Sequence, residues 1–122
     1  MKVPNYSPLQ LAASLNEFWS PKVISSLDDS YVKVAKLKGE FFLHKHDNED
    51  ELFYILKGNL VIEYEDHKVN LTTGDLHIVP KGVMHNPIAE VECLVMLIEK
   101  KETLHTGGIQ ANETKSIEEQ LS

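Results

Sequence analysis

GEFFLHKHDNEDELFYILKG, the stretch from Gly39 to Gly58, contains two histidines, His44 and His46, between apolar and aromatic neighbours. Alternate side chains of an extended strand point to the same face, so both imidazoles are expected to project together. The acidic residues 47–50 predict a turn, after which Glu51 begins a second apolar run. That run would carry a carboxylate back towards the histidines, an arrangement that is typical of metal ligands.

The carboxylate of this predicted site has two candidates. Glu51 shares strand parity with Phe53 and Ile55, whose apolar side chains are expected to face the interior. Asp50 has the opposite parity, and Glu51 is therefore favoured as the ligand. Phe42 shares the face of the two histidines, so Phe42, Phe53 and Ile55 are predicted to line the pocket beside the ligands.

A second stretch, GDLHIVPKGVMHNP from Gly74 to Pro87, offers a third imidazole. A Gly-Asp turn leads into a short strand, residues 80–82 interrupt it, and His85 follows the interruption. His77 lies in that strand, where both faces are apolar, so parity does not decide whether it faces the pocket. One interpretation of His77 is a group that orients a ligand or contacts substrate, and the other is a packed strand residue.

The spacing G-x4-H-x-H-x4-E-x6-G in the first stretch, followed by G-x5-P-x-G-x2-H in the second, resembles the two motifs of the cupin superfamily. The resemblance covers roughly residues 31 to 98. It implies a site for one divalent transition metal (Fe, Mn, Zn, Ni or Cu) whose ligands are His44, His46, Glu51 and His85. The first spacer is one residue shorter than usual, and Ala89 stands where the family often has asparagine.

The fold predicted for the chain is all-β. The resemblance implies a double-stranded β-helix, the cupin jelly-roll barrel, with a short N-terminal helix and a peripheral C-terminal tail. The expected boundaries are a helix and lead-in strand at 1–30, the barrel at 31–99 and a polar tail at 100–122. Because the chain has 122 residues, of which 42% are hydrophobic, these parts are expected to form one structural domain around a single core.

The N-terminal helix is expected to begin at Ser7, because Ser7 can cap it and Pro8 suits its first turn. Apolar residues at helical spacing continue to Phe18 and Trp19, and Pro21 then ends the helix. Trp19 is expected to serve packing. Residues 31–38 alternate loosely, with Lys33 between two valines, and predict a strand that is buried on one face.

A second apolar face is predicted on the strands that carry the ligands. Five residues have the parity opposite to the ligand-bearing face: Phe41, Leu43, Leu52, Tyr54 and Leu56. So many exposed apolar side chains are unusual for a monomer. The N-terminal helix or a second subunit is expected to cover them, and a homodimer is the favoured prediction.

Composition narrows the possible partners and location. The net charge of -7 gives the chain no counterion-release advantage on a polyanion, so nucleic acid is not an expected partner. All 12 basic residues are lysines, so an arginine clamp for phosphorylated substrates is missing. No apolar run approaches the length of a membrane span. Cys93 is the single cysteine and is expected to be a small buried hydrophobe, and a cytoplasmic protein without a membrane partner is predicted.

The function that the resemblance implies is a metal-binding cupin acting on a small molecule at a site of three histidines and one glutamate. Dioxygenase and isomerase chemistry are both compatible with such a site. The alternative is a non-catalytic module of the same fold that binds or senses a small ligand. Neither the substrate nor a catalytic residue beyond the predicted metal ligands is identified by the sequence.

Overall fold

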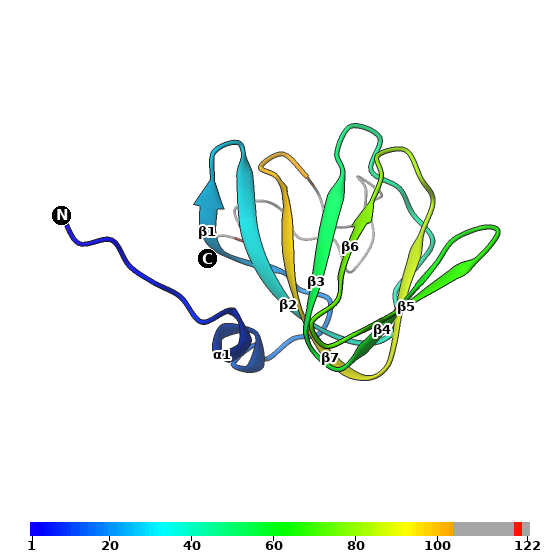
Figure 1. The fold of residues 1–122 in the computed structure, drawn as a ribbon, viewed down its shortest axis with the longest axis horizontal. Coiled ribbons are helices and arrows are strands. Elements are labelled where there is room, and N and C mark those ends of the chain that lie inside the picture. Colours follow the sequence, from blue (N-terminus) through cyan, green and yellow to red (C-terminus); the bar gives the residue numbers. More distant parts are fainter. Residues whose placement is uncertain (104–118, 121–122) are drawn as a thin grey trace.

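The structure is a computed structural model that describes residues 1–103 and 119–120. Its elements in chain order are α1 (Pro8–Ala13), β1 (Lys22–Leu27), β2 (Ser30–Glu40), β3 (Glu51–Lys57), β4 (Asn59–Glu63), β5 (Lys68–Thr72), β6 (Leu76–Val79) and β7 (Asn86–Lys100). Figure 1 shows the strands curling around a common interior, with α1 at one end of β2. Most of the predicted tail at 100–122 lies outside the described residues.

The strands pair antiparallel in the order β1-β2-β7-β3-β6, and β4 pairs with both β5 and β7. β7 is the strand that holds this arrangement together. One of its edges pairs with β2, from Ser30↔Lys100 to Glu40↔Ile88. Its other edge pairs with β3 over residues 94–98 and with β4 over residues 86–88. β7 therefore passes from one half of the barrel to the other, and the predicted all-β jelly-roll fold is confirmed.

The core lies between the inner faces of these strands. Its buried apolar side chains are Ala35, Leu37, Phe53, Ile55, Leu60, Ile62, Tyr64, Leu71, Val79, Ala89, Cys93, Val95 and Leu97. Cys93 has no exposed surface, and burial raises the pKa of its thiol to about 11. The prediction that Cys93 is a small buried hydrophobe is confirmed.

A smaller cluster lies on the outer face, where α1 packs. There Ala12 meets Val34 of β2 and Leu94 of β7, with Leu56 of β3 beside them. The middle of β2 is consequently buried on both faces, and the expectation of a strand buried on one face is wrong. Among the described residues, no helix has the length and apolar character needed to span a membrane.

The N-terminal helix is shorter than the apolar spacing predicted, because it ends at Ala13. Ser7 caps it as expected and accepts a hydrogen bond from the Gln10 N–H at 3.4 Å. Trp19 lies outside the helix, with its backbone N–H bonded to Lys36 O at 2.9 Å. This contact with a distant strand competes with helical hydrogen bonding and overrides the local pattern.

Candidate metal centre

The two histidine-bearing stretches meet at a single backbone bridge between His44 and His85. The His44 N–H donates to His85 O at 3.0 Å, and the His85 N–H donates to His44 O at 2.8 Å. Apart from this bridge, residues 41–46 are not a strand, contrary to expectation. Phe41 N–H still reaches Pro87 O at 3.2 Å, but Pro87 has no N–H to return, so the β2–β7 ladder stops there.

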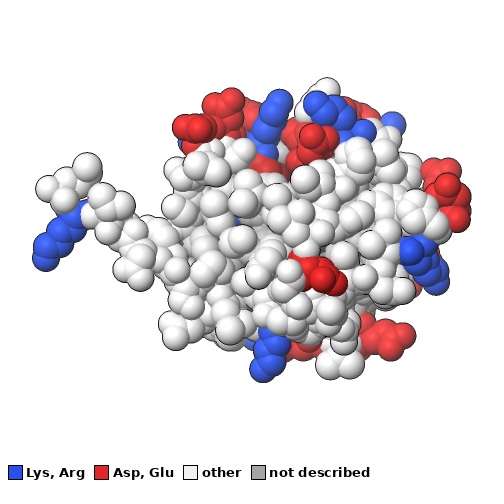
Figure 2. Space-filling view, in the orientation of Figure 1, with Lys and Arg blue, Asp and Glu red and all other residues white. Residues whose placement is uncertain are grey.

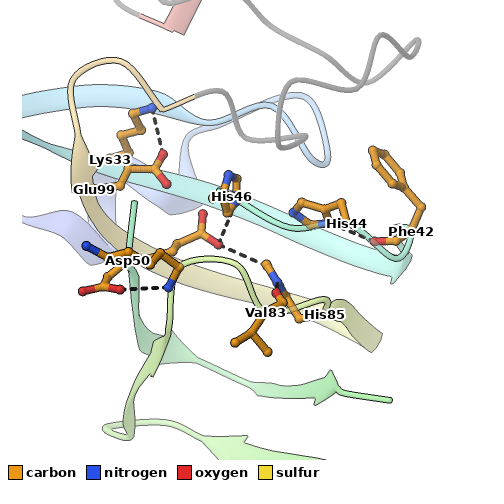
Figure 3. Close-up of polar contacts among 10 residues, drawn as sticks. Lys33, Phe42, His44, His46, Asp50, Val83, His85 and Glu99 are labelled. Carbon is orange, nitrogen blue, oxygen red and sulfur yellow. Dashed lines mark hydrogen bonds and ion pairs between the residues drawn. The ribbon is translucent and has the colours of Figure 1, made fainter. Parts of the chain in front are cut away.

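Backbone carbonyls orient two of the imidazoles. His44 Nδ1 lies 2.9 Å from Phe42 O, and His85 Nδ1 lies 3.0 Å from Val83 O. A ring nitrogen that faces a carbonyl oxygen must carry a proton, so Nε2 is the nitrogen that offers a lone pair in the neutral form of each ring. Figure 3 shows both rings turned towards the same interior space. A hydrogen bond from the other ring nitrogen to a carbonyl oxygen commonly orients metal-binding histidines in proteins.

Three imidazoles and one carboxylate converge in this space. The ligand atoms offered by His44, His46 and His85 all lie within 4.8 Å of one another. Glu51 Oε1 lies 3.4 Å from His46 Nε2 and 3.5 Å from His85 Nε2 (Figure 3). All four side chains are buried. The structure therefore brings the four predicted ligands together.

Two imidazole nitrogens of this centre have no hydrogen-bond partner among the described residues. Within the described residues, His46 Nε2 and His85 Nε2 are buried without a hydrogen bond, since the approach of Glu51 is too long to make a good one. Buried polar atoms in native proteins almost always have a partner, and a bound cation would supply one here. The donor set and its unpartnered nitrogens therefore fit a divalent transition metal.

The pKa shifts of His44 and Glu51 favour the protonation states that bind a metal. Burial and the nearby His85 lower the pKa of His44 to about 4, so His44 is neutral at physiological pH. Burial raises the pKa of Glu51, but His46 and His85 outweigh it and hold that pKa well below its usual value. Burial lowers the pKa of His46, but the nearby Glu51 carboxylate outweighs burial, and the pKa rises. A metal would have to displace any proton on His46.

Asp50, the other candidate for the carboxylate ligand, binds a backbone N–H group instead of facing the imidazoles. It is exposed, and its Oδ1 accepts a hydrogen bond from the Lys81 backbone N–H at 2.9 Å. Asp50 thereby ties the loop before β3 to the loop before His85 (Figure 3). Of the two candidates, Glu51 is the one whose carboxylate faces the imidazoles.

The predicted pocket residues divide into three groups. Phe42 lies beside the centre, with its ring centroid 5.3 Å from that of His44, and Phe53 lines a cavity there. Ile55 is buried in the core and is not part of that lining. His77 stands opposite Phe53 in the β3–β6 ladder and shares a 2.6 Å hydrogen bond with the Tyr64 hydroxyl. His77 therefore belongs to a separate pair and not to the group of three imidazoles.

A buried ion pair near Glu51 was not anticipated. Lys33 Nζ lies 2.8 Å from Glu99 Oε1, both side chains are fully buried, and Lys33 also donates to Gln120 Oε1. Burial first, and then the charge of Glu51, raise the pKa of Glu99 well above its usual value. A sequence signal existed: Lys33 shares its parity with the inward Ala35 and Leu37 of the same strand.

A small cavity adjoins the centre at His44 and Glu51. Its volume is about 30 Å³. Apart from those two residues its lining is apolar and consists of Trp19, Pro21, Ala35, Leu37, Phe41, Phe53, Pro87, Val95 and Leu97.

An antiparallel jelly-roll with three histidines and a glutamate in its interior defines a class of small β-barrel proteins with a candidate metal centre. The model of the cupin domain family (Cupin_2) matches residues 31–99. The chain belongs to this family.

Similar proteins agree with this assignment. YdbB of Bacillus subtilis (strain 168), named as an uncharacterized protein, is 32% identical over 113 residues, which are 92% of either chain. The crystal structure of a cupin-2 domain containing protein from Shewanella frigidimarina NCIMB 400 has 38% identity and a TM-score of 0.73, and the match covers 75% of this chain and 89% of that one. The pectin degradation protein KdgF of Dickeya dadantii (strain 3937) is 33% identical over 54 residues, 44% of this chain and 49% of KdgF.

Proposed function

We propose that the protein is a metal-dependent cupin that binds one divalent transition metal and acts on a small molecule that chelates it. The ligands would be His44, His46, Glu51 and His85. The observation that carries this proposal is the pair of buried, unpartnered Nε2 atoms of His46 and His85 opposite the Glu51 carboxylate. Such an arrangement is costly in a protein unless a cation completes it.

Three nitrogens and one oxygen suit iron, manganese, zinc, nickel or copper, and a six-coordinate ion would keep two positions open. When bound, such a metal polarises a ligand oxygen or supports chemistry with dioxygen, as dioxygenases and isomerases require. The protein residues would hold the metal and orient its ligands. The carbonyl oxygens of Phe42 and Val83 fix two imidazoles, and Glu51 adds a negative charge. Apolar walls such as Phe53 exclude water from the reacting side.

The substrates that fit this proposal are small chelating compounds with no more than one negative charge. The chain has no arginine and a net charge of -7, so a phosphorylated substrate would lack a bidentate partner. 2-Oxo acids, hydroxy acids and catechol-like diols satisfy these conditions. The likeness to the pectin degradation protein KdgF supports an enzyme of the family, and uronic acids of the kind found in pectin belong in the substrate screen.

The alternative is a non-catalytic module that binds or senses a small ligand. The lining of the cavity favours it, because the polar side chains there, His44 and Glu51, are both expected metal ligands, and the described lining residues offer no separate group for proton transfer. Binding of a chelating ligand without turnover would identify this function.

The experiment begins with elemental analysis of the purified protein. The protein is then loaded anaerobically with ferrous iron, and oxygen consumption is followed after addition of pyruvate, lactate, catechol or galacturonate. In parallel, anaerobic samples loaded with Mn, Zn or Ni are examined by NMR for isomerisation of each compound. The variant His46→Ala/His85→Ala is the control for metal that is not bound at the site. Turnover that the control lacks supports the enzyme, and stoichiometric binding without turnover supports the module. A protein that takes up none of these metals would overturn both.

A further inference from the structure

Two aromatic rings form the outer wall of the cavity beside the metal centre. The rings of Trp19 and Phe41 are stacked with centroids 4.8 Å apart and planes inclined by 20°. Phe41 in turn meets His44 edge-on, with centroids 5.4 Å apart. Both Trp19 and Phe41 are half-buried, whereas the inner lining is buried. The wall therefore separates the cavity from solvent and touches a predicted metal ligand.

The chain holds Trp19 in this wall by specific means. The indole N–H donates to Lys38 O at 2.8 Å, and the backbone N–H donates to Lys36 O. The backbone φ of Trp19 is 56°, a left-handed conformation that is costly for a bulky residue. Trp19 packs against the interior cluster of the barrel and is absent from the cluster between α1 and the sheet. Packing of the helix therefore does not account for its position.

We propose that Trp19 determines the specificity of the site by closing a chamber that takes the short apolar arm of a chelating substrate. This inference rests on the proposed function. A cavity of about 30 Å³ holds roughly two water-sized positions. An arm of about two carbons fits that space, and a longer arm meets the indole ring.

The lining sets the chemistry of the arm. His44 and Glu51 are the polar side chains in it, and both face the metal centre. A hydroxyl group on the arm would lose its hydrogen bonds to water without gaining new ones, which strongly disfavours it. The substrate class is therefore a 2-oxo or 2-hydroxy acid with a short, unbranched alkyl arm, and not a polyhydroxylated acid.

The test uses the metal-loaded full chain and the fluorescence of Trp19, which is the single tryptophan. The ligands are glyoxylate, pyruvate, 2-oxobutanoate and 2-oxohexanoate, which differ in the length of the arm. Hydroxypyruvate is the polar counterpart of 2-oxobutanoate with the same number of non-hydrogen atoms. Affinity is expected to rise about fourfold per carbon up to 2-oxobutanoate. Hydroxypyruvate should bind at least about tenfold more weakly than 2-oxobutanoate, and 2-oxohexanoate should also bind more weakly.

Variants test whether the dependence of affinity on arm length is due to the aromatic wall. Their affinities are measured by calorimetry. Trp19→Ala should remove the penalty on 2-oxohexanoate, so that it binds at least as well as 2-oxobutanoate. Phe18→Ala is the matched control, because this neighbouring ring is 45% exposed and lies outside the cavity lining. Phe18→Ala should keep the wild-type order. Val95→Ala enlarges the opposite wall and should also admit the longer arm, which keeps the test valid if Trp19→Ala does not fold.

Equal affinities along the series, or the wild-type order in both Trp19→Ala and Val95→Ala, would overturn the inference. Glyoxylate distinguishes this result from failure of the proposed function, because it has no arm. If glyoxylate binds the metal-loaded protein but arm length has no effect, the metal-dependent function stands and the role of Trp19 is wrong. If neither glyoxylate nor any longer acid binds, both are wrong.

Discussion

His46 and His85 contribute the two buried nitrogens for which the described residues offer no hydrogen-bond partner. Replacing both with alanine should reduce metal content from one ion per chain to nearly none, because His44 and Glu51 alone make a weak site. The barrel should stay folded, since neither imidazole is part of the apolar core. Elemental analysis and far-UV circular dichroism of the purified His46→Ala/His85→Ala protein test this prediction.

His77→Ala is the matched control for that experiment. His77 is also an imidazole of the barrel, but its partner is the Tyr64 hydroxyl and not the metal centre. Metal content should not change in His77→Ala. Retention of stoichiometric metal by the double variant would refute the ligand assignment.

The ion pair of Lys33 and Glu99 should matter more for stability than an ordinary lysine contact. Lys33→Met leaves the buried Glu99 without its cation and should lower the free energy of unfolding by about 3–5 kcal/mol. Lys36→Met on the same strand is the control. Lys36 Nζ lies 3.9 Å from a half-exposed Glu92 carboxylate and donates to Ala13 O at 3.2 Å, and the loss of these contacts should cost only about 1–2 kcal/mol.

Urea denaturation measures these differences. The double variant Lys33→Met/Glu99→Leu should be more stable than Lys33→Met alone, because it removes a buried carboxyl group that has lost its partner. Equal losses for Lys33→Met and Lys36→Met would show that the fully buried pair contributes no more than the partly exposed contacts of Lys36.

The same residues show what the sequence reveals about the site. The spacing of histidines and glutamate located four side chains that the structure brings together. Lys33 and Glu99 were missed because strand patterns are recognised from apolar residues, and a charged residue among them is ordinarily assigned to the outer face. A buried pair is recognisable only when both strands and their register are known.

Helices and strands were predicted well where local sequence patterns determine their bounds. They were predicted less well where contacts with distant parts of the chain determine those bounds. The start of α1 after Ser7 and the strand β3 from Glu51 follow from a capping residue and an apolar run. The end of α1 does not, because Trp19 bonds to carbonyls of β2 that the local sequence does not reveal. The interruption of the predicted strand at residues 41–46 likewise depends on Pro87, a residue far along the chain.

Gly58 joins β3 directly to β4 with a φ of 108° while its backbone passes close over β7. A Cβ at this position would lie 3.1 Å from Glu92 O and 3.3 Å from Cys93 Cα. Gly58→Ala therefore adds a steric conflict to the backbone strain, and a loss of at least about 2 kcal/mol in unfolding free energy is expected.

Gly39→Ala separates the two costs. Gly39 has a φ of 85°, but a Cβ there would meet no atom within 4 Å among the described residues. Only the backbone strain of about 1–2 kcal/mol should appear in thermal or urea unfolding of Gly39→Ala. If Gly58→Ala is no less stable than Gly39→Ala, the close approach to β7 is unimportant.

The whole molecule has an outer sheet face that α1 leaves open. Cross-strand pairing places Leu52 beside Ile78 and Tyr54 beside Leu76, and Leu76 and Ile78 are 57% and 49% exposed. In Figure 2 charged side chains gather around the rim of the view, and its middle is mostly uncharged. Of the five residues predicted for this face, Leu56 is covered by α1, Phe41 stacks on Trp19 and Leu43 lies beside the turn at residues 63–68, which leaves Leu52 and Tyr54.

We expect a second copy of the chain to cover this face. Sedimentation at micromolar concentration should show a homodimer, and Ile78→Glu should shift it to monomer because a buried unpaired charge opposes association. Val91→Glu is the control, since Val91 is an exposed apolar residue of β7 outside this face. A wild-type monomer would contradict the prediction.

The position of β7 in the chain has a consequence for biosynthesis. The ribosome makes β7 after all the strands that it joins, and until then β2 pairs only with β1, β3 with β6 and β4 with β5. Two-stranded ladders are at best marginally stable in water. The nascent chain therefore exposes the inner faces of three separate ladders until β7 has left the ribosome. The barrel cannot close before that point, and this interval is when the chain depends most on chaperones to avoid aggregation.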